Sequence, residues 1–412
     1  TSGTTKGTSS NGIYANNSTA GTSLTINAEA TTGTLGIKAD NDGDGALSIT
    51  TTGTTTGTNT SGISANNSAA STGDLMINSV DTMGAGDGMV VYNMGNGALS
   101  ITTSGTTTGG VGDGIFAFNF VNTGALSITT SGTTMGNRYA IQAYNAGSGV
   151  INITATGITT GGPDANGPNA NGVGIRAISQ AEGIMIDAGA TTGGYRGILA
   201  YSSPNGNGDL TINAIDTTGG DDGIFASISN TANTGDLTIN AATTTGTRND
   251  GIFANNLGTG ALSITTTGTT TGGSNGIDAN NDGTSLTINA ATTTGATSGI
   301  YATNLGTGAL EITTTGTTTG SSSHGIYANN STAGTSLKIT AEDTTGTQGI
   351  YAANEGGALE ITTTGTTTGT STDGIFAANF AAGTSLTISA ATTTGAARGI
   401  AAINSGTGAL EI

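Results

Sequence analysis

Residues 251–272 read Gly-Ile-Phe-Ala-Asn-Asn-Leu-Gly-Thr-Gly-Ala-Leu-Ser-Ile-Thr-Thr-Thr-Gly-Thr-Thr-Thr-Gly, and this stretch contains the whole pattern that decides the fold. Ile252 and Ala254 are separated by one residue, as are Leu262 and Ile264, and a spacing of two places side chains on the same face of a strand. The closing Thr-Gly segment is rich in β-branched residues, which favour strands. One such unit therefore predicts three short β-strands joined at glycine-rich corners.

The same unit recurs along the whole chain. Degenerate copies of Gly-Ile-x-Ala-x-Asn begin at residues 12, 36, 62, 88, 114, 140, 174, 197, 223, 251, 276, 299, 325, 349, 374 and 399. Repeats of this length with three strands each predict an all-β fold, a parallel β-helix solenoid of about 16 coils, built as a single repeat domain over residues 1–412. The alternative is a set of separate antiparallel units, and a propeller blade would need four strands in about 40–50 residues.

An asparagine lies four residues after the Ile in most copies, on the same face as the Ile and the Ala. A buried amide needs hydrogen-bond partners, and identical Asn residues stacked on successive coils can supply them to one another. We therefore predict a structural asparagine ladder rather than a ligand site. Its members are Asn17, Asn41, Asn67, Asn93, Asn119, Asn145, Asn256, Asn281, Asn304, Asn330, Asn354, Asn379 and Asn404.

The residue directly after the Ile points outward, and half of the aromatic side chains of the chain occur there. They are Tyr14, Phe116, Phe225, Phe253, Tyr301, Tyr327, Tyr351 and Phe376. An exposed apolar row of this kind usually meets a partner, so we predict a contact face. Ring stacking between coils, packing against another solenoid and stacking on sugars all remain open explanations.

The composition excludes several classes of function. The chain has 26 acidic and 8 basic residues, a net charge of −18, no Cys and one His, His324. A surface this acidic repels nucleic acid. Without cysteine there is no disulfide, thiolate metal site or thiol nucleophile. No run approaches the 18 or so apolar residues of a membrane-spanning helix, so we expect no membrane insertion of this segment.

The copies of Gly-Ile-Tyr-Ala-Asn-Asn at 12–17 and 325–330, together with residues 258–272, resemble the passenger-domain repeats of bacterial autotransporters and related β-strand-repeat surface proteins. The resemblance covers essentially the whole chain and is specific for architecture rather than activity. It implies a right-handed β-helix that is exported and displayed at the cell surface or released outside the cell. Because the last residues, Glu411 and Ile412, fall in the middle of a coil, we expect an internal piece of a longer protein.

One short segment has the spacing of a calcium loop. Asp40, Asp42 and Asp44 alternate before Gly45, which places oxygen donors around a bend. The twelfth position, where a bidentate Glu belongs, is Thr51, so a plain polar turn is the alternative. Calcium is the only cofactor that the sequence suggests.

The material for catalysis is sparse. Asp221 and Asp222 are adjacent, and alternate strand residues point in opposite directions. Glu311 and Glu360 occupy equivalent outward positions two coils apart, at the edge of the separation that glycoside hydrolysis requires. We therefore expect no enzymatic activity.

Two further features bear on recognition. Outward threonine pairs, such as Thr269 and Thr271, suggest the flat face of an ice-binding protein, although glycines such as Gly268 interrupt them. Residues 157–173, which hold two of the three Pro residues, lengthen one repeat and predict a protruding insertion loop that carries specificity.

Taken together, these patterns predict a non-enzymatic, extracellular or cell-surface structural rod, either a stalk or adhesin or a filament-forming protein. Its expected partners are further copies of itself, in fibres or bundles, or glycans or proteins of a host or cell surface. The alternatives are a β-helix that binds or degrades polysaccharide and an ice-binding protein.

Overall fold

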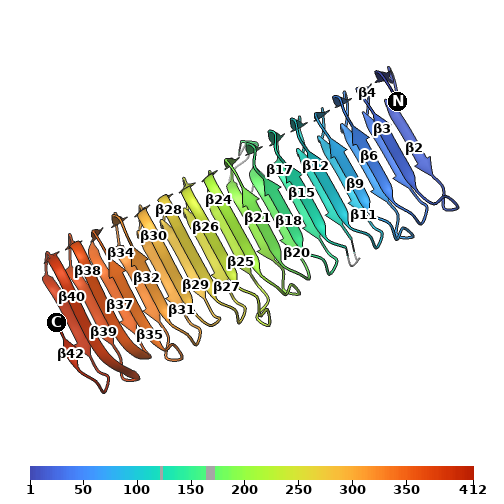
Figure 1. The fold of residues 1–412 in the computed structure, drawn as a ribbon. Helices are drawn as coiled ribbons and strands as arrows, with labels where there is room; N and C mark the ends of the chain where they lie inside the picture. The colour runs from blue at the N-terminus through green and yellow to red at the C-terminus, as the bar shows by residue number, and fades with distance from the viewer. Residues whose placement is uncertain (121–123, 164–171) are drawn as a thin grey trace. The chain divides into compact units, whose positions relative to one another are not determined.

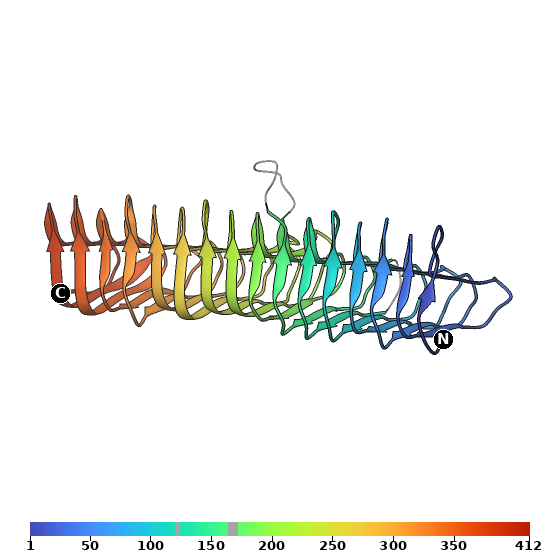
Figure 2. The same ribbon diagram turned by 90° about the horizontal axis from the view of Figure 1, so that it is seen from above.

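The computed structural model describes residues 1–120, 124–163 and 172–412. The chain divides into two compact units, Thr1–Gly208 and Asp209–Ile412. Within each unit the chain winds into successive coils whose strands lie side by side, and a view turned by 90° shows the same outline repeating from coil to coil (Figures 1 and 2). The predicted all-β parallel solenoid with three strands per coil is confirmed. The described residues contain no helix with the length and hydropathy needed to cross a membrane.

In the first unit, each coil contributes one strand to each of three parallel stacks. The strands of the Gly-Ile segments are β2 (Ile13–Asn17), β5 (Ile37–Asn41), β8 (Ile63–Asn67), β11 (Met89–Asn93), β14 (Ile115–Asn119), β17 (Tyr139–Asn145), β20 (Val173–Ser179) and β23 (Arg196–Ser202). Those of the second apolar pair are β3 (Leu24–Ala28), β6 (Leu47–Thr51), β9 (Leu75–Ser79), β12 (Leu99–Thr103), β15 (Leu126–Thr130), β18 (Ile151–Ala155) and β21 (Ile184–Ala188). Those of the Thr-Gly segments are β1 (Thr5–Lys6), β4 (Thr31–Gly33), β7 (Thr55–Gly57), β10 (Thr82–Gly84), β13 (Thr107–Gly109), β16 (Thr134–Gly136), β19 (Thr159–Gly161) and β22 (Thr191–Gly193).

The second unit has the same Gly-Ile strands, but in most of its coils the second and third segments run on as one strand. The Gly-Ile strands are β25 (Ile224–Ile228), β27 (Ile252–Asn256), β29 (Ile277–Asn281), β31 (Ile300–Asn304), β34 (His324–Asn330), β37 (Gln348–Asn354), β39 (Asp373–Asn379) and β41 (Arg398–Asn404). The continuous strands are β24 (Leu210–Gly219), β26 (Leu237–Gly246), β28 (Leu262–Gly272), β30 (Leu286–Gly295), β38 (Gly357–Gly369) and β40 (Gly383–Gly395). The separate ones are β32 (Leu310–Thr314), β33 (Thr318–Gly320), β35 (Ser336–Ala341), β36 (Thr344–Gly346) and β42 (Leu410–Glu411).

Where neighbouring coils differ in length, a β-bulge keeps their strands paired. Strand β28 has 11 residues, whereas its neighbours β26 and β30 have 10. The register shifts between Ala241 and Thr244 and again between Thr266 and Thr269. A bulge places one extra residue opposite its partner strand and leaves the pairing on both sides intact. The alternation of short and long repeats therefore does not disturb the interior columns.

Pairing is parallel and in register, so each repeat position forms a column along its unit. Asn41 pairs with Asn67 in the first unit, and Asn281 pairs with Asn304 in the second. The Ile, Leu and Ala columns point inward and are almost completely excluded from solvent, as at Leu47 and Leu262. Full burial of such a side chain contributes about 1.5–3 kcal/mol, which makes these columns the main source of stability.

In most Gly-Ile segments neighbouring backbone approaches the Gly closely, although one coil has Ala140 at this position. A Cβ atom added to Gly88 would lie 2.4 Å from the carbonyl oxygen of Gly114 and 3.0 Å from the methyl carbon of Thr107. That Thr belongs to an inward threonine column that the sequence analysis did not find. Like Thr270 in the second unit, it is fully buried, and its hydroxyl has no hydrogen-bond partner.

The predicted insertion at 157–173 begins and ends in regular strands. Strand β19 lies in the stack of Thr-Gly strands and pairs with β16, and strand β20 begins at Val173. Residues 164–171 of the predicted loop lie outside the described residues.

Candidate functional site

The asparagine column is a hydrogen-bonded ladder inside each unit, as predicted. In the first unit each side-chain Nδ2 donates to the Oδ1 of the next Asn, from Asn17 to Asn145, over 2.8–3.1 Å. In the second unit the same relay runs from Asn256 to Asn404 over 2.8–3.0 Å. Most of these amides also donate to a corner carbonyl, as Asn304 does to Gly308 at 3.1 Å. All thirteen predicted residues belong to the two ladders, whose bonds satisfy the buried amides.

Other polar groups replace Asn where the ladder lapses. Ser179 follows Asn145 in the column, and its hydroxyl donates to the carbonyl of Glu182 at 2.6 Å. Ile228 occupies the Asn position of β25, and the fully buried Asn233 lies in the following corner, where its Oδ1 accepts a hydrogen bond from Gly235 N. Sequence reasoning missed Asn233, although an Asn in the corner after an apolar residue at the ladder position was a usable signal.

The predicted contact residues of the second unit form an outward stack, which we call the aromatic column: Phe225, Phe253, Tyr301, Tyr327, Tyr351 and Phe376. The ring centroids of Tyr301 and Tyr327 are 4.5 Å apart, those of Tyr327 and Tyr351 5.0 Å, and those of Tyr351 and Phe376 5.2 Å, with interplanar angles of 2–13°. Phe225 and Phe253 stack at 4.9 Å. The rings therefore cover each other's faces and present mainly their edges to solvent.

The first unit arranges its aromatic residues differently. Tyr14 is 59% exposed and lies under the Lys38 ammonium group, 5.5 Å from its ring centroid. Phe116 contacts Tyr92 and Phe118, and Phe118 stacks on Tyr144 at 4.5 Å. Tyr92, Phe118 and Tyr144 belong to the next outward position of the strand, which sequence reasoning left out because it followed only the residue after the Ile.

Two cavities lie beside the aromatic column of the second unit, and together we call them the groove. In these cavities the residue three positions before a column residue forms part of the other wall, as Ser298 does before Tyr301 and His324 before Tyr327. One, of about 410 Å³, is bounded by Asn275, Asp278, Thr297, Ser298, Tyr301, Ser323, His324 and Tyr327.

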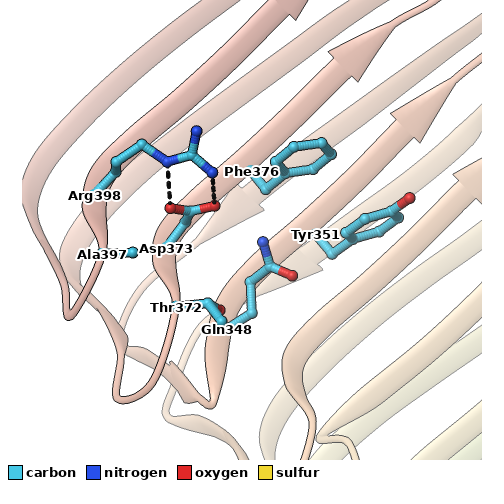
Figure 3. A pocket seen from close by; sticks show the side chains of 7 residues that line it. All are labelled: Gln348, Tyr351, Thr372, Asp373, Phe376, Ala397 and Arg398. Carbon is cyan, nitrogen blue, oxygen red and sulfur yellow. Dashed lines mark hydrogen bonds and ion pairs between the residues drawn. The ribbon is translucent and has the colours of Figure 1, made fainter.

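The other cavity, of about 280 Å³, is shown in Figure 3. Arg398 donates two hydrogen bonds to the carboxylate of Asp373, from Nε at 2.8 Å and from Nη2 at 2.9 Å. The guanidinium group therefore balances the charge of this carboxylate. The side chain of Gln348 lies between that ion pair and the ring of Tyr351 (Figure 3). Phe376 lines the cavity beside Tyr351. A cation, an amide and aromatic rings therefore converge on one small hollow.

Burial controls the protonation of the groups around the groove. Desolvation raises the pKa of Asp250 to about 7, with a further contribution from the nearby Asp278 and Asp222. Desolvation likewise raises the pKa of Asp278 above its usual range. Desolvation lowers the pKa of His324, whose Nδ1 shares a hydrogen bond of 2.7 Å with the Ser323 hydroxyl and whose ring packs edge-on against Tyr327.

The three aspartates of the predicted calcium loop do not converge. Asp40 pairs with Lys38 at 3.2 Å, and the backbone N–H of Asp42 donates to the carbonyl of Asn17. Across residues 1–120, 124–163 and 172–412, no group of three or more acidic or histidine side chains is placed to hold a metal ion. The geometry of this segment is that of a polar turn.

The acids considered for catalysis are also dispersed. Asp222 is fully buried and accepts hydrogen bonds from Asn249 Nδ2 and Asp250 N. Lys338 lies between Glu311 and Glu360 in one outward column, 3.5 Å from the carboxylate of Glu360.

The threonine face is discontinuous. Thr269 and Thr271 point outward as predicted, and each flanks the inward Thr270. The parallel outward columns are broken by Met76, Met83 and Met185 in the first unit, where these side chains are 42–47% exposed, and by Glu311 and Lys338 in the second. A flat array of threonines does not extend along either unit.

Comparison with protein-family models, with curated proteins and with solved structures gives no match in any of the three.

Proposed function

We propose that this chain is a non-enzymatic structural solenoid that acts outside the cell through its outer surface, as a stalk or adhesin or as a filament. The observation that carries the proposal is the contrast between a closed interior and a patterned exterior. The interior columns are packed and hydrogen-bonded along each unit, so they leave no channel for a substrate. The side chains capable of recognition are on the outside.

The aromatic column favours contact along the solenoid surface. Because neighbouring rings stack on one another, most of the ring faces are occupied, and the exposed parts are mainly ring edges and the hydroxyl groups of Tyr301, Tyr327 and Tyr351. Such a surface suits side-by-side packing against a second copy or another protein more than face-on stacking of sugars along the column. The low charge content, 8% of residues, also lets identical surfaces approach.

The extracellular location is supported by the resemblance to passenger repeats. The hydrogen bonds that hold Asp222 and the ion pair between Lys338 and Glu360 are consistent with structural roles for these acids. A polysaccharide ligand in the groove is the second candidate, because both cavities combine polar groups with an aromatic wall.

The experiment that tests the proposal combines electron microscopy with sedimentation velocity on the purified chain. Bundles or filaments that dissociate when Tyr301, Tyr327 and Tyr351 are replaced by Ser would support lateral contact through the aromatic column. The triple replacement of outward residues Ser263, Thr287 and Thr313 by Ala is the matched control. Monodisperse particles at all concentrations, together with hydrolysis of a polysaccharide, would refute the proposal.

A further inference from the structure

The aromatic column has a single gap. Asp278 occupies the column position between Phe253 on one neighbouring coil and Tyr301 on the other. Its side chain is much shorter than those of its neighbours, so the space above its carboxylate lacks the ring that the pattern of the column would place there. A cavity of about 410 Å³, lined by Asp278, Tyr301 and Tyr327 among others, adjoins this space on the side of Tyr301.

Two aromatic faces border this gap. Phe253 stacks on Phe225 with its other face, at 4.9 Å and 11°. Tyr301 stacks on Tyr327 with its other face, at 4.5 Å and 4°. Successive coils are about 4.8 Å apart, which puts the two bordering rings about 10 Å from each other. A flat group inserted midway would lie about 5 Å from each ring, which is within the range of aromatic stacking.

The carboxylate of Asp278 lies at the base of the gap and can accept further hydrogen bonds. Asn280 Nδ2 donates to one carboxylate oxygen of Asp278 at 2.8 Å, and Asn275 Nδ2 donates to the other at 3.3 Å. A carboxylate offers about four lone-pair sites, so two remain for a ligand. The two amides also fix the orientation of the carboxylate, which prepares it for a donor that approaches from outside.

The charge at the gap is not compensated from within the chain. Among the described residues Asp278 forms no ion pair. Burial raises the pKa of its carboxyl group, and the nearby Asp222 raises it further. The neighbouring carboxylates and the net charge of −18 give this region a negative potential. The faces of the two rings carry negative partial charge as well. Every element of the gap therefore favours a cation over a neutral sugar or an anion.

We propose that the gap is a binding slot for a guanidinium group, supplied by an arginine side chain of a partner protein. A guanidinium ion is flat, so both of its faces can stack on the rings of Phe253 and Tyr301. Its edge carries N–H donors in a fixed plane that matches a carboxylate, here that of Asp278. An ammonium group is compact and strongly hydrated, and it would use the ring faces less well. This inference does not depend on self-assembly of the chain.

The test uses the acetylated amide of arginine as a probe and isothermal titration calorimetry on the full chain. The citrulline analogue has the same shape without the charge, and we expect it to bind at least tenfold more weakly. Asp278→Asn should weaken binding of the arginine probe at least tenfold. Asp282→Asn, which removes an exposed acid in the following corner, should leave binding unchanged and is the matched control.

A second variant separates binding from folding. Asp278→Phe fills the slot with the missing ring, so it should keep or raise the unfolding temperature while abolishing binding. The proposal would be overturned if the arginine probe showed no measurable binding, if citrulline bound equally well, or if Asp278→Phe still bound the probe. Equal affinity for tetramethylammonium would show a general cation site and would overturn the assignment to guanidinium.

Discussion

The two units have the same pattern of interior residues, but their outward-facing residues differ. Along the ladder, both present Asn after Asn with the same bonding geometry, as at Asn93 and Asn304. At the outward position directly after the interior Ile, the second unit has a nearly continuous aromatic column. At that same position the first unit has a mixture that includes Lys38, Ser64 and Gln142. The interior is constrained by the stacking of coils, whereas the exterior is free to vary with what it contacts.

Breaking the ladder should have the largest effect, and the effect should be alike in both units. Asn304→Ala removes the acceptor of Asn281 Nδ2 and the donor to Asn330 Oδ1 and to the Gly308 carbonyl. Each buried polar group left without a partner costs about 1–3 kcal/mol, so for these three groups we expect a loss of at least about 3 kcal/mol in the free energy of unfolding.

Urea denaturation of Asn304→Ala and of Asn93→Ala checks this prediction, because Asn93 has the equivalent bonds in the first unit. Asn329→Ala, an outward neighbour of the ladder, is the control and should change stability by less than about 0.5 kcal/mol. A large difference between Asn93→Ala and Asn304→Ala would contradict the shared interior.

The close approach of coils can be tested at one corner. Gly88→Ala places a Cβ atom 2.4 Å from the carbonyl oxygen of Gly114, so we expect a loss of about 2–3 kcal/mol from overpacking. Gly86→Ala is matched in sequence and chemistry, and there the nearest atom would be 3.4 Å away. Thermal unfolding followed by circular dichroism should separate the two variants, and equal melting temperatures would refute this account of the Gly-Ile motif.

Because their outward residues differ, the two units should respond differently when the residue after the Ile is replaced by Ala. Tyr327→Ala removes stacking on both Tyr301 and Tyr351, and aromatic pairs contribute about 0.5–1.5 kcal/mol each beyond their buried area. We expect a loss of about 1–3 kcal/mol. Ser64→Ala at the equivalent position of the first unit should be nearly neutral. Chemical denaturation of both variants measures the difference, and a neutral Tyr327→Ala would show that the column does not stabilise the second unit.

The buried acids of the second unit predict a pH dependence. Burial raises the pKa of Asp250 from its ordinary value of 3.8 to about 7 in the folded state, so between these pH values the folded state holds more protons than the unfolded state. This contribution to stability is therefore present below about pH 4 and decreases as the pH rises toward 7. Asp250→Asn should flatten the fall in melting temperature between pH 4.5 and pH 7.5, whereas the exposed-site variant Asp282→Asn should reproduce the parent profile.

The smallest expected effect is an increase in stability. The hydroxyl of Thr270 is buried without a partner, and Val has the same shape without that group. Thr270→Val should raise the free energy of unfolding by about 1 kcal/mol. Thr271→Val, on the outward side of the same strand, should change it little. A destabilised Thr270→Val would mean that the hydroxyl is hydrogen-bonded in solution.

The sequence could predict the repeating fold because its signal is local and repeated. The spacing of two at Ile252 and Ala254 indicates a strand, and the recurrence of Asn four residues after Ile indicates a column only if coils stack in register. Both expectations agree with the pairing of β27 and β29. The inward threonines were missed because a Thr-Thr-Gly segment has no polarity difference that would show which residue points inside.

The candidate site was less predictable. The members of the aromatic column could be named, but their ring stacking, the groove beside them and the role of Asp278 could not. The groove wall is formed by residues such as Ser298 and His324, which belong to corners and carry no periodic signal. The slot is formed by residues of three successive coils. The sequence of a single repeat does not show which residues lie beside it on the neighbouring coils.

By itself, the sequence determined the strands, the inward Ile, Ala and Asn columns and the acidic, cysteine-free surface, because these follow from side-chain alternation within one repeat and from composition. The tertiary structure alone decided which outward residues touch. It placed Asp278 between two rings, Lys338 between two glutamates and Arg398 on Asp373. The physical reason is that these contacts run across coils, between residues about 25 positions apart, where register and not local pattern sets the neighbours.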